Sequence, residues 1–135
     1  MIFYLNGQYV PREAAMIPVE DRAFLFGDGI YEGVRSLGGK MFEWAAHADR
    51  MVNGLNGLRI NFSAAQVNAL EGVCERVVQE NGLVDGEAFV YLEVSRGAAP
   101  RTHNFPPIGT PPTVFVSASR LVVPRKMRHE GGAVI

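Results

Sequence analysis

The stretch from Phe26 to Leu37 constrains the fold of this chain more than any other part of the sequence. It opens with Gly27-Asp28-Gly29, a strong turn signal, because glycine reaches positive φ values that other residues avoid. The residues that follow alternate with a period of two, which predicts a β-strand. One face of that strand would carry Tyr31, Gly33 and Arg35, although a face made for packing would hold branched or aromatic side chains. This face is a candidate binding surface; an ordinary edge strand with an exposed arginine is the alternative.

The rest of the chain predicts further hairpins, helices and strands. These are a hairpin over residues 3–10 turning at Asn6-Gly7, a second hairpin turning at Gly38-Gly39, helices over 44–58 and 63–81, and strands over 87–95 and 113–119. The second helix begins with a capping box from Ser63 to Gln66. Residues 12–25 are expected to form a connecting segment. The predicted fold class is α+β, an antiparallel sheet with two helices packed on one side.

Composition narrows the classes of function. The 135 residues include 13 basic and 14 acidic residues, a formal net charge of −1, so we expect no nucleic-acid partner. No apolar run approaches a membrane span and the first residues lack signal-peptide features, so we expect a cytoplasmic protein without a membrane partner. The single cysteine, Cys74, allows no intrachain disulfide. The three histidines show no metal-ligand spacing, so no metal site is expected.

A proline-rich loop after the 87–95 strand holds the second candidate site. Arg101 and His103 are two residues apart, so in an extended segment both side chains would project the same way. A guanidinium binds a carboxylate through two hydrogen bonds, and an imidazole adds a donor. With the Tyr31 hydroxyl they could bind the carboxylate of a small acid. Arg-x-His by itself is a weak signal, and a solvated loop arginine beside a chance histidine is the alternative.

Three motifs in this order carry a family resemblance. They are Phe26-Gly-Asp-Gly-Ile-Tyr-Glu32, His47-Ala-Asp-Arg50, and Ser95-Arg-Gly-Ala-Ala-Pro-Arg-Thr-His103. Together they resemble the fold-type IV pyridoxal-phosphate enzymes, which include D-amino acid aminotransferases, branched-chain aminotransferases and aminodeoxychorismate lyases. The likeness covers nearly the whole chain, but only the smaller N-terminal domain of such enzymes. The Arg-x-His loop favours the D-amino acid aminotransferase branch.

The resemblance implies a cofactor, pyridoxal 5′-phosphate, and substrates, an amino acid and a 2-oxo acid. It implies that Arg50 holds the cofactor phosphate, although an ordinary salt bridge on a helix surface is the alternative. It implies that Tyr31, Gly33, Arg101 and His103 line the substrate site, with extra room at the glycine. It also implies a homodimer.

One feature of the family is missing. Its reaction needs a lysine that carries the cofactor as a Schiff base and moves a proton. The two lysines here, Lys40 and Lys126, lack the family's sequence context, so no residue of this chain is assigned a catalytic role. We expect residues 1–120 to form the N-terminal domain, and 121–135 a linker and the start of a C-terminal domain that holds the lysine. The alternatives are another reaction of the same fold or a non-catalytic binding or assembly domain.

Overall fold

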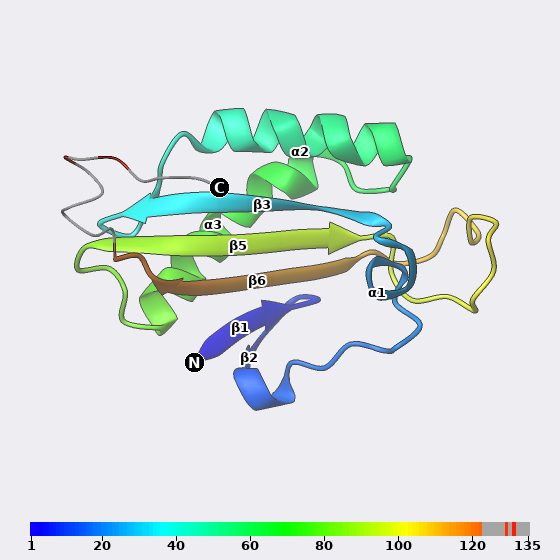
Figure 1. The fold of residues 1–135 in the computed structure, drawn as a ribbon, viewed down its shortest axis with the longest axis horizontal. Helices are drawn as coiled ribbons and strands as arrows, with labels where there is room; N and C mark the ends of the chain where they lie inside the picture. Colours follow the sequence, from blue (N-terminus) through cyan, green and yellow to red (C-terminus); the bar gives the residue numbers. More distant parts are fainter. Residues whose placement is uncertain (123–128, 130, 132–135) are drawn as a thin grey trace.

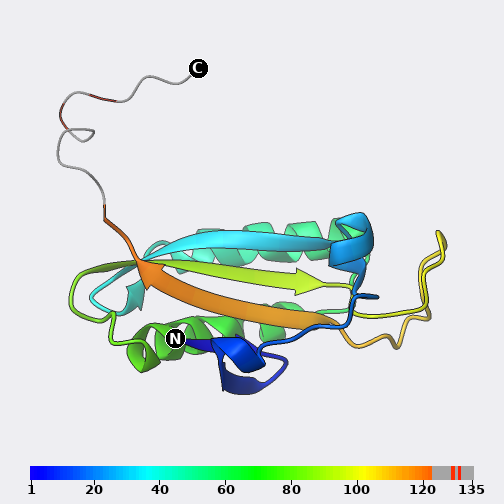
Figure 2. The same cartoon turned by 60° about the horizontal axis from the view of Figure 1, so that its bottom comes forward.

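The structure, a computed structural model, describes residues 1–122, 129 and 131. Six strands form one antiparallel sheet in the order β2-β1-β6-β5-β3-β4. The strands are β1 (Ile2–Leu5), β2 (Gln8–Pro11), β3 (Gly29–Leu37), β4 (Lys40–Met41), β5 (Glu87–Ser95) and β6 (Thr113–Arg120). The helices are α1 (Arg22–Phe26), α2 (Trp44–Leu58) and α3 (Ala64–Glu80), with a 3₁₀ turn, η1 (Arg12–Ala14). Helices α2 and α3 cover the same face of the sheet, which confirms the predicted fold class (Figures 1 and 2).

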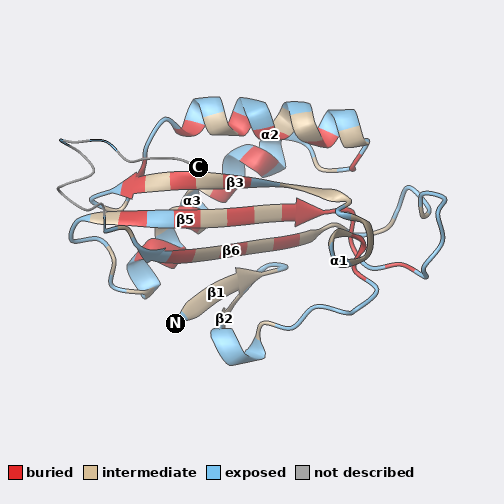
Figure 3. Ribbon diagram, in the orientation of Figure 1, coloured by how far each residue is buried: buried red, intermediate tan, exposed pale blue. Residues whose placement is uncertain are grey.

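Period-two alternation in the central strands builds the core. Val34, Val90 and Val116, on three neighbouring strands, are fully buried beneath the helices. Buried residues alternate with less buried ones along β3, β5 and β6 (Figure 3). The sheet therefore has a covered face towards the helices and an open face on its other side.

The two predicted hairpin turns are confirmed. Asn6 and Gly7 have φ values of 48° and 94°, and Gly38 and Gly39 have values of 57° and 84°. Positive φ at both central residues is the type I′ geometry that matches the twist of a hairpin. The second turn leaves β4 only two residues long, so most of β3 has a free edge on that side.

The predicted helices are also confirmed. Helix α3 is capped as expected: the Ser63 hydroxyl accepts a hydrogen bond from the Gln66 amide, and the Gln66 side chain accepts one from the Ser63 amide at 2.8 Å. Cys74 lies in the core, where burial raises the pKa of its thiol to about 12. Its environment suits packing and not reactivity.

The interpretation of residues 12–25 as a mere connection is wrong, because they contain η1 and α1. Asp21 caps α1 by accepting a hydrogen bond from the Ala23 amide at 2.9 Å. Its buried carboxylate also accepts hydrogen bonds from Ser95 at 2.8 Å and Thr113 at 2.6 Å. These contacts with β5 and β6 hold a helix too short to be stable alone. Gly27, at a φ of 64°, ends it.

The expected linker and incoming strand at 121–135 lie largely outside the described residues, as does Lys126. That division of the chain stays a prediction. Within the described part, no helix has the length and apolar character needed to cross a bilayer.

Candidate active site

Glu32 is the centre of the first cluster. It lies on the covered face of β3, where its side chain is only 3% exposed. The Arg50 guanidinium donates to both Glu32 carboxylate oxygens, and its Nε lies 2.6 Å from Oε1. The Nδ1 atom of His47, one turn earlier on α2, lies 2.7 Å from Oε2. A buried carboxylate without such partners would be costly, so the two α2 side chains account for its position.

Burial disfavours the ionised form of Glu32. The hydrogen bonds from Arg50 and His47 outweigh that effect and hold the pKa of Glu32 below its ordinary value. The cluster therefore keeps a carboxylate ionised beneath the sheet and fixes the guanidinium of Arg50 in one orientation.

Arg50 itself faces outwards, since its side chain is 69% exposed. It lines a pocket of about 320 Å³ at the free edge of β3, together with Tyr31 and Gly54. A Cβ atom at Gly54 would lie 3.0 Å from the Ile30 side chain, so the glycine lets α2 approach β3 closely. The structure thus brings Arg50 and Tyr31 to one pocket.

Tyr31 belongs to an aromatic group on the open face. Its ring stacks on Tyr91 of β5, with the centroids 5.6 Å apart. The Tyr91 hydroxyl donates to Glu93 at 2.8 Å, and burial together with this bond raises the pKa of Tyr91 to about 12. The Tyr31 ring is therefore held against a neutral phenol, and Tyr31 remains exposed to a ligand.

The expected extra room at Gly33 is occupied by a neighbouring side chain. A Cβ atom at Gly33 would lie 2.8 Å from two ring carbons of Phe89. The Phe89 ring on β5 therefore covers the space that a side chain at position 33 would fill. The glycine permits this close approach across the sheet and does not leave an empty pocket.

Arg101 and His103 lie together beside Phe26. The Arg101 guanidinium carbon is 5.5 Å from the Phe26 ring centroid, and the His103 ring is 6.0 Å from it. Their segment is irregular and projects beyond the end of the sheet near α1 (Figures 1 and 2). Tyr31 lines pockets of about 320 Å³ and about 230 Å³, and neither Arg101 nor His103 lines these two pockets. The three expected carboxylate ligands are therefore not brought together in either of these two pockets.

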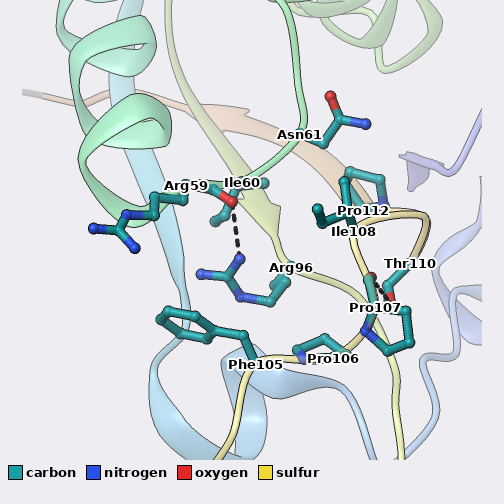
Figure 4. Close-up of a pocket in the computed structure, with 10 residues that line it drawn as sticks. All are labelled: Arg59, Ile60, Asn61, Arg96, Phe105, Pro106, Pro107, Ile108, Thr110 and Pro112. Atoms are coloured by element: carbon teal, nitrogen blue, oxygen red, sulfur yellow. Dashed lines mark hydrogen bonds between the residues drawn. The ribbon is translucent and has the colours of Figure 1, made fainter.

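A second ion-paired carboxylate, Asp28, lies at the base of this loop, and its side chain is 9% exposed. Arg22 and Arg96 both donate to it. Burial disfavours its ionised form, but these bonds outweigh burial and hold the pKa of Asp28 below its ordinary value. On its far side Arg96 contacts Phe105 and lines a pocket of about 380 Å³ between the end of α2 and the 105–112 segment (Figure 4).

Sequence reasoning missed the partners in both clusters. One signal could have found the first: Glu32 alternates with Ile30 and Val34, and an acid at an inward strand position requires a partner. No comparable signal marks Arg96, whose partners lie 37 to 68 residues away, or the loop contacts of Arg22, which lie 80 and 82 residues away. Only Asp28 is near Arg22 in the sequence, six residues further on.

Comparison with known proteins agrees with the resemblance. The model of the family described as "Amino-transferase class IV" matches residues 29–132. A D-alanine aminotransferase of Staphylococcus epidermidis is 39% identical over 111 residues, which are 81% of this chain and 36% of that protein. The D-alanine aminotransferase of Listeria monocytogenes is 38% identical over 136 residues, covering 97% of this chain and 45% of that protein.

Solved structures show the same fold. An Escherichia coli branched-chain amino acid aminotransferase superposes with a TM-score of 0.77 at 24% identity, over 89% of this chain and 40% of that chain. A second branched-chain amino acid aminotransferase, complexed with N-(5′-phosphopyridoxyl)-L-glutamate, gives a TM-score of 0.74 at 26% identity with the same coverage. The chain spans less than half the length of these relatives and belongs to the class IV aminotransferase family.

Proposed function

We propose that this chain forms the N-terminal part of a pyridoxal-phosphate-dependent aminotransferase that moves an amino group between a D-amino acid and a 2-oxo acid. The observation that carries the proposal is the Arg50 guanidinium, which buried Glu32 holds in a pocket shared with Tyr31. The identity to two D-alanine aminotransferases supports the choice of substrate class.

The donors on Arg50 fit a cofactor phosphate. Its Nε and Nη2 atoms bond Glu32, while among the described residues none accepts a hydrogen bond from its Nη1 atom. An exposed guanidinium edge of this kind suits phosphate oxygens. When bound, pyridoxal phosphate would supply an electron-withdrawing ring that stabilises negative charge on the substrate α-carbon. The residues of this chain would hold and orient it.

Arg101 and His103 are proposed to bind the substrate carboxylate. Because they lie beside Phe26 and not in the Tyr31–Arg50 pocket, we further propose a homodimer in which the loop of one copy meets the pocket of the other. Co-expression tests this arrangement. In a hybrid enzyme that carries this chain, Arg50→Leu and Arg101→Leu should each have low activity at limiting cofactor and D-alanine. A dimer with one copy of each variant should regain part of the activity, whereas a site within one chain would give no recovery.

The lysine that carries the cofactor is proposed to lie outside the described residues. Lys40 instead forms an ion pair with Glu75 of α3, with its Nζ atom 3.0 Å from the carboxylate. Mixing the chain with pyridoxal phosphate and reducing with borohydride should give no pyridoxyl label on Lys40 by mass analysis. Stoichiometric labelling there would contradict this assignment.

A hybrid enzyme gives the direct test of function. In it, this chain replaces the matching segment of the Listeria monocytogenes D-alanine aminotransferase. The hybrid should bind pyridoxal phosphate and transfer the amino group of D-alanine. Its affinity for the cofactor should depend on Arg50 of this chain, and its KM for D-alanine on Arg101. A hybrid that binds the cofactor but accepts only L-leucine would favour the branched-chain alternative. The similarity to solved branched-chain aminotransferases is the reason for testing that substrate.

A further inference from the structure

Helix α1 has no part in the function proposed so far. It lies at the end of the sheet from which the 98–112 loop projects (Figure 1). Its first residue, Arg22, is a charged residue whose side chain is only 4% exposed. Such burial of an arginine requires several hydrogen-bond partners, and those partners indicate what the residue does.

Arg22 connects a fixed carboxylate to the loop. Its Nε atom donates to Oδ2 of Asp28 at 2.7 Å. Its Nη1 atom donates to the carbonyl of Thr102 at 3.1 Å and, more weakly, to that of Asn104 at 3.4 Å. These two carbonyls flank His103 and follow Arg101. Within the part of the chain that the structure describes, every hydrogen bond reaching residues 101–104 from outside that segment comes from Arg22.

The carboxylate is itself anchored. Arg96 donates to both oxygens of Asp28, from Nε at 2.7 Å and from Nη2 at 3.0 Å. It also donates to the Leu58 carbonyl at 2.5 Å and to the Arg59 carbonyl at 3.0 Å, at the C-terminal end of α2. Figure 4 shows the bond to Arg59. Helix α2 carries Arg50, so the chain of contacts ties the loop to the same rigid helix that presents the phosphate-binding side chain.

An aromatic ring completes the support. Phe26, one turn after Arg22 on α1, lies 4.5 Å from the Arg22 guanidinium carbon. The same ring is in contact range of Arg101 and His103. A residue of α1 therefore contacts both of the loop side chains that are assigned to the substrate carboxylate.

We propose that Arg22 is a positioning residue for the carboxylate-binding loop, oriented by Asp28 and Arg96 and assisted by Phe26. It holds the backbone on both sides of His103, so that Arg101 and His103 are ordered before a substrate arrives. Preordering removes part of the entropy that a mobile loop would lose on binding. The positioning is a property of this chain; its effect on a substrate carboxylate rests on the proposed function.

Trypsin cleavage after Arg101 in the 135-residue chain tests the positioning directly. Arg22→Met keeps an unbranched side chain on Phe26 and leaves Asp28 paired with Arg96, but it removes every bond to the loop. We expect cleavage of the Arg101–Thr102 bond to become about tenfold faster, because the local opening that trypsin needs is no longer opposed. Cleavage within α3, after Arg76, should stay unchanged.

Arg120→Met is the matched control, because it also removes an arginine-to-carbonyl bond, at 3.2 Å to Asp85. It should leave cleavage after Arg101 unchanged. Arg22→Lys guards against a folding defect, since it keeps the cation beside Asp28 but cannot also span to Thr102, and it should speed cleavage as well. Wild-type cleavage rates in both Arg22 variants would overturn the proposal. An equal acceleration at Arg76 in both would do the same, because it would show a general loss of stability.

The hybrid enzyme then tests the consequence for substrate. Arg22→Lys should raise KM for D-alanine about fivefold to tenfold, change kcat by less than about twofold, and leave cofactor affinity unchanged, since loop order affects binding of the carboxylate. An active hybrid with unchanged KM would refute the inference and leave the proposed function intact. A hybrid that holds the cofactor but is inactive before any Arg22 change would instead refute the proposed function, while the trypsin result would stand by itself.

Discussion

Glu32, beneath α2, and Asp28, at the base of the loop, are both paired with arginine. The two clusters differ in how far the arginine side chains are exposed. Each is a carboxylate held by arginine with little of its side chain exposed, 3% at Glu32 and 9% at Asp28, and each has its pKa held below the ordinary value. At Glu32 the arginine side chain is 69% exposed, whereas at Asp28 the two arginine side chains are only 4% and 9% exposed. The first cluster presents a largely exposed guanidinium to a pocket. The second keeps both guanidinium groups largely covered, although Arg96 also borders the pocket beside Phe105.

This difference in exposure distinguishes an arginine that can bind a ligand from arginines that position the backbone. An exposed guanidinium fixed by an inner carboxylate retains donors for an external anion. The buried guanidinium groups instead donate hydrogen bonds to backbone carbonyls of the protein itself, at Thr102, Leu58 and Arg59. The pairing chemistry is the same in both clusters, and exposure decides which arginine can meet a ligand.

Neutralising each carboxylate in turn should lower the free energy of unfolding by different amounts, and this is the largest expected effect. Asp28→Asn would leave two buried cations without a counter-charge and should lower the free energy of unfolding by about 3–5 kcal/mol. Glu32→Gln should cost less, about 1–3 kcal/mol, because Arg50 can turn to water. Urea unfolding of the chain measures both, and an equal or reversed order would contradict the comparison.

Arg101→Leu tests whether the 98–112 loop binds the substrate and not the cofactor. In the hybrid, KM for D-alanine should rise about tenfold to a hundredfold with little change in kcat, because a carboxylate contact is made equally in the ground and transition states. Steady-state kinetics with D-alanine measure this, and Arg120→Leu on β6 serves as the control. Loss of cofactor from the Arg101 variant would contradict the assignment of the cofactor to Arg50 and of the substrate carboxylate to Arg101.

The two carboxylates also predict the pH dependence of stability. Their pKa values are lowered on folding, so the unfolded chain binds more protons as the pH falls, and folding loses stability. The stabilisation should be complete above about pH 5 and decline below about pH 4, the range of unfolded carboxyl groups. Urea unfolding from pH 7 downwards should show this decline, and Asp28→Asn should make it shallower. A decline of the same steepness in the variant would show that Asp28 contributes nothing to it.

Substitution of Gly33 should give the smallest effect, since it touches neither cluster. A methyl group there would displace the outer edge of the Phe89 ring, which is 40% exposed and can turn away, so Gly33→Ala should change stability by less than about 1 kcal/mol. In a Phe89→Ala background the cost should vanish, as a double-mutant cycle would measure. Equal costs in both backgrounds would show that the ring does not fill this space.

The fold could be predicted because its signals are local. The alternation around Val34 and Val90, the Asn6-Gly7 turn and the Ser63–Gln66 capping box each lie within a few residues. Helix α1 escaped prediction because a five-residue helix has little periodicity. It is held instead by Asp21, whose partners Ser95 and Thr113 lie 74 and 92 residues away.

The site was predictable only in part for the same reason. Motif resemblance pointed to Arg50, Tyr31, Arg101 and His103, but not to what orients them. Arg50 meets Glu32 across 18 residues, and Arg22 meets Thr102 across 80, so no spacing rule connects them. The room expected at Gly33 was misjudged because Phe89, on the neighbouring strand, fills it.

The affinity of the hybrid for pyridoxal phosphate in two variants tests the central claim most directly. Arg50→Leu should weaken cofactor binding about tenfold to a hundredfold, the usual worth of a charged hydrogen bond to phosphate, while Arg101→Leu should leave it unchanged. An equilibrium titration followed by cofactor absorbance gives both dissociation constants. If Arg50→Leu retained wild-type affinity, or if Arg101→Leu lost affinity equally, the exposed guanidinium on α2 would not be the phosphate site.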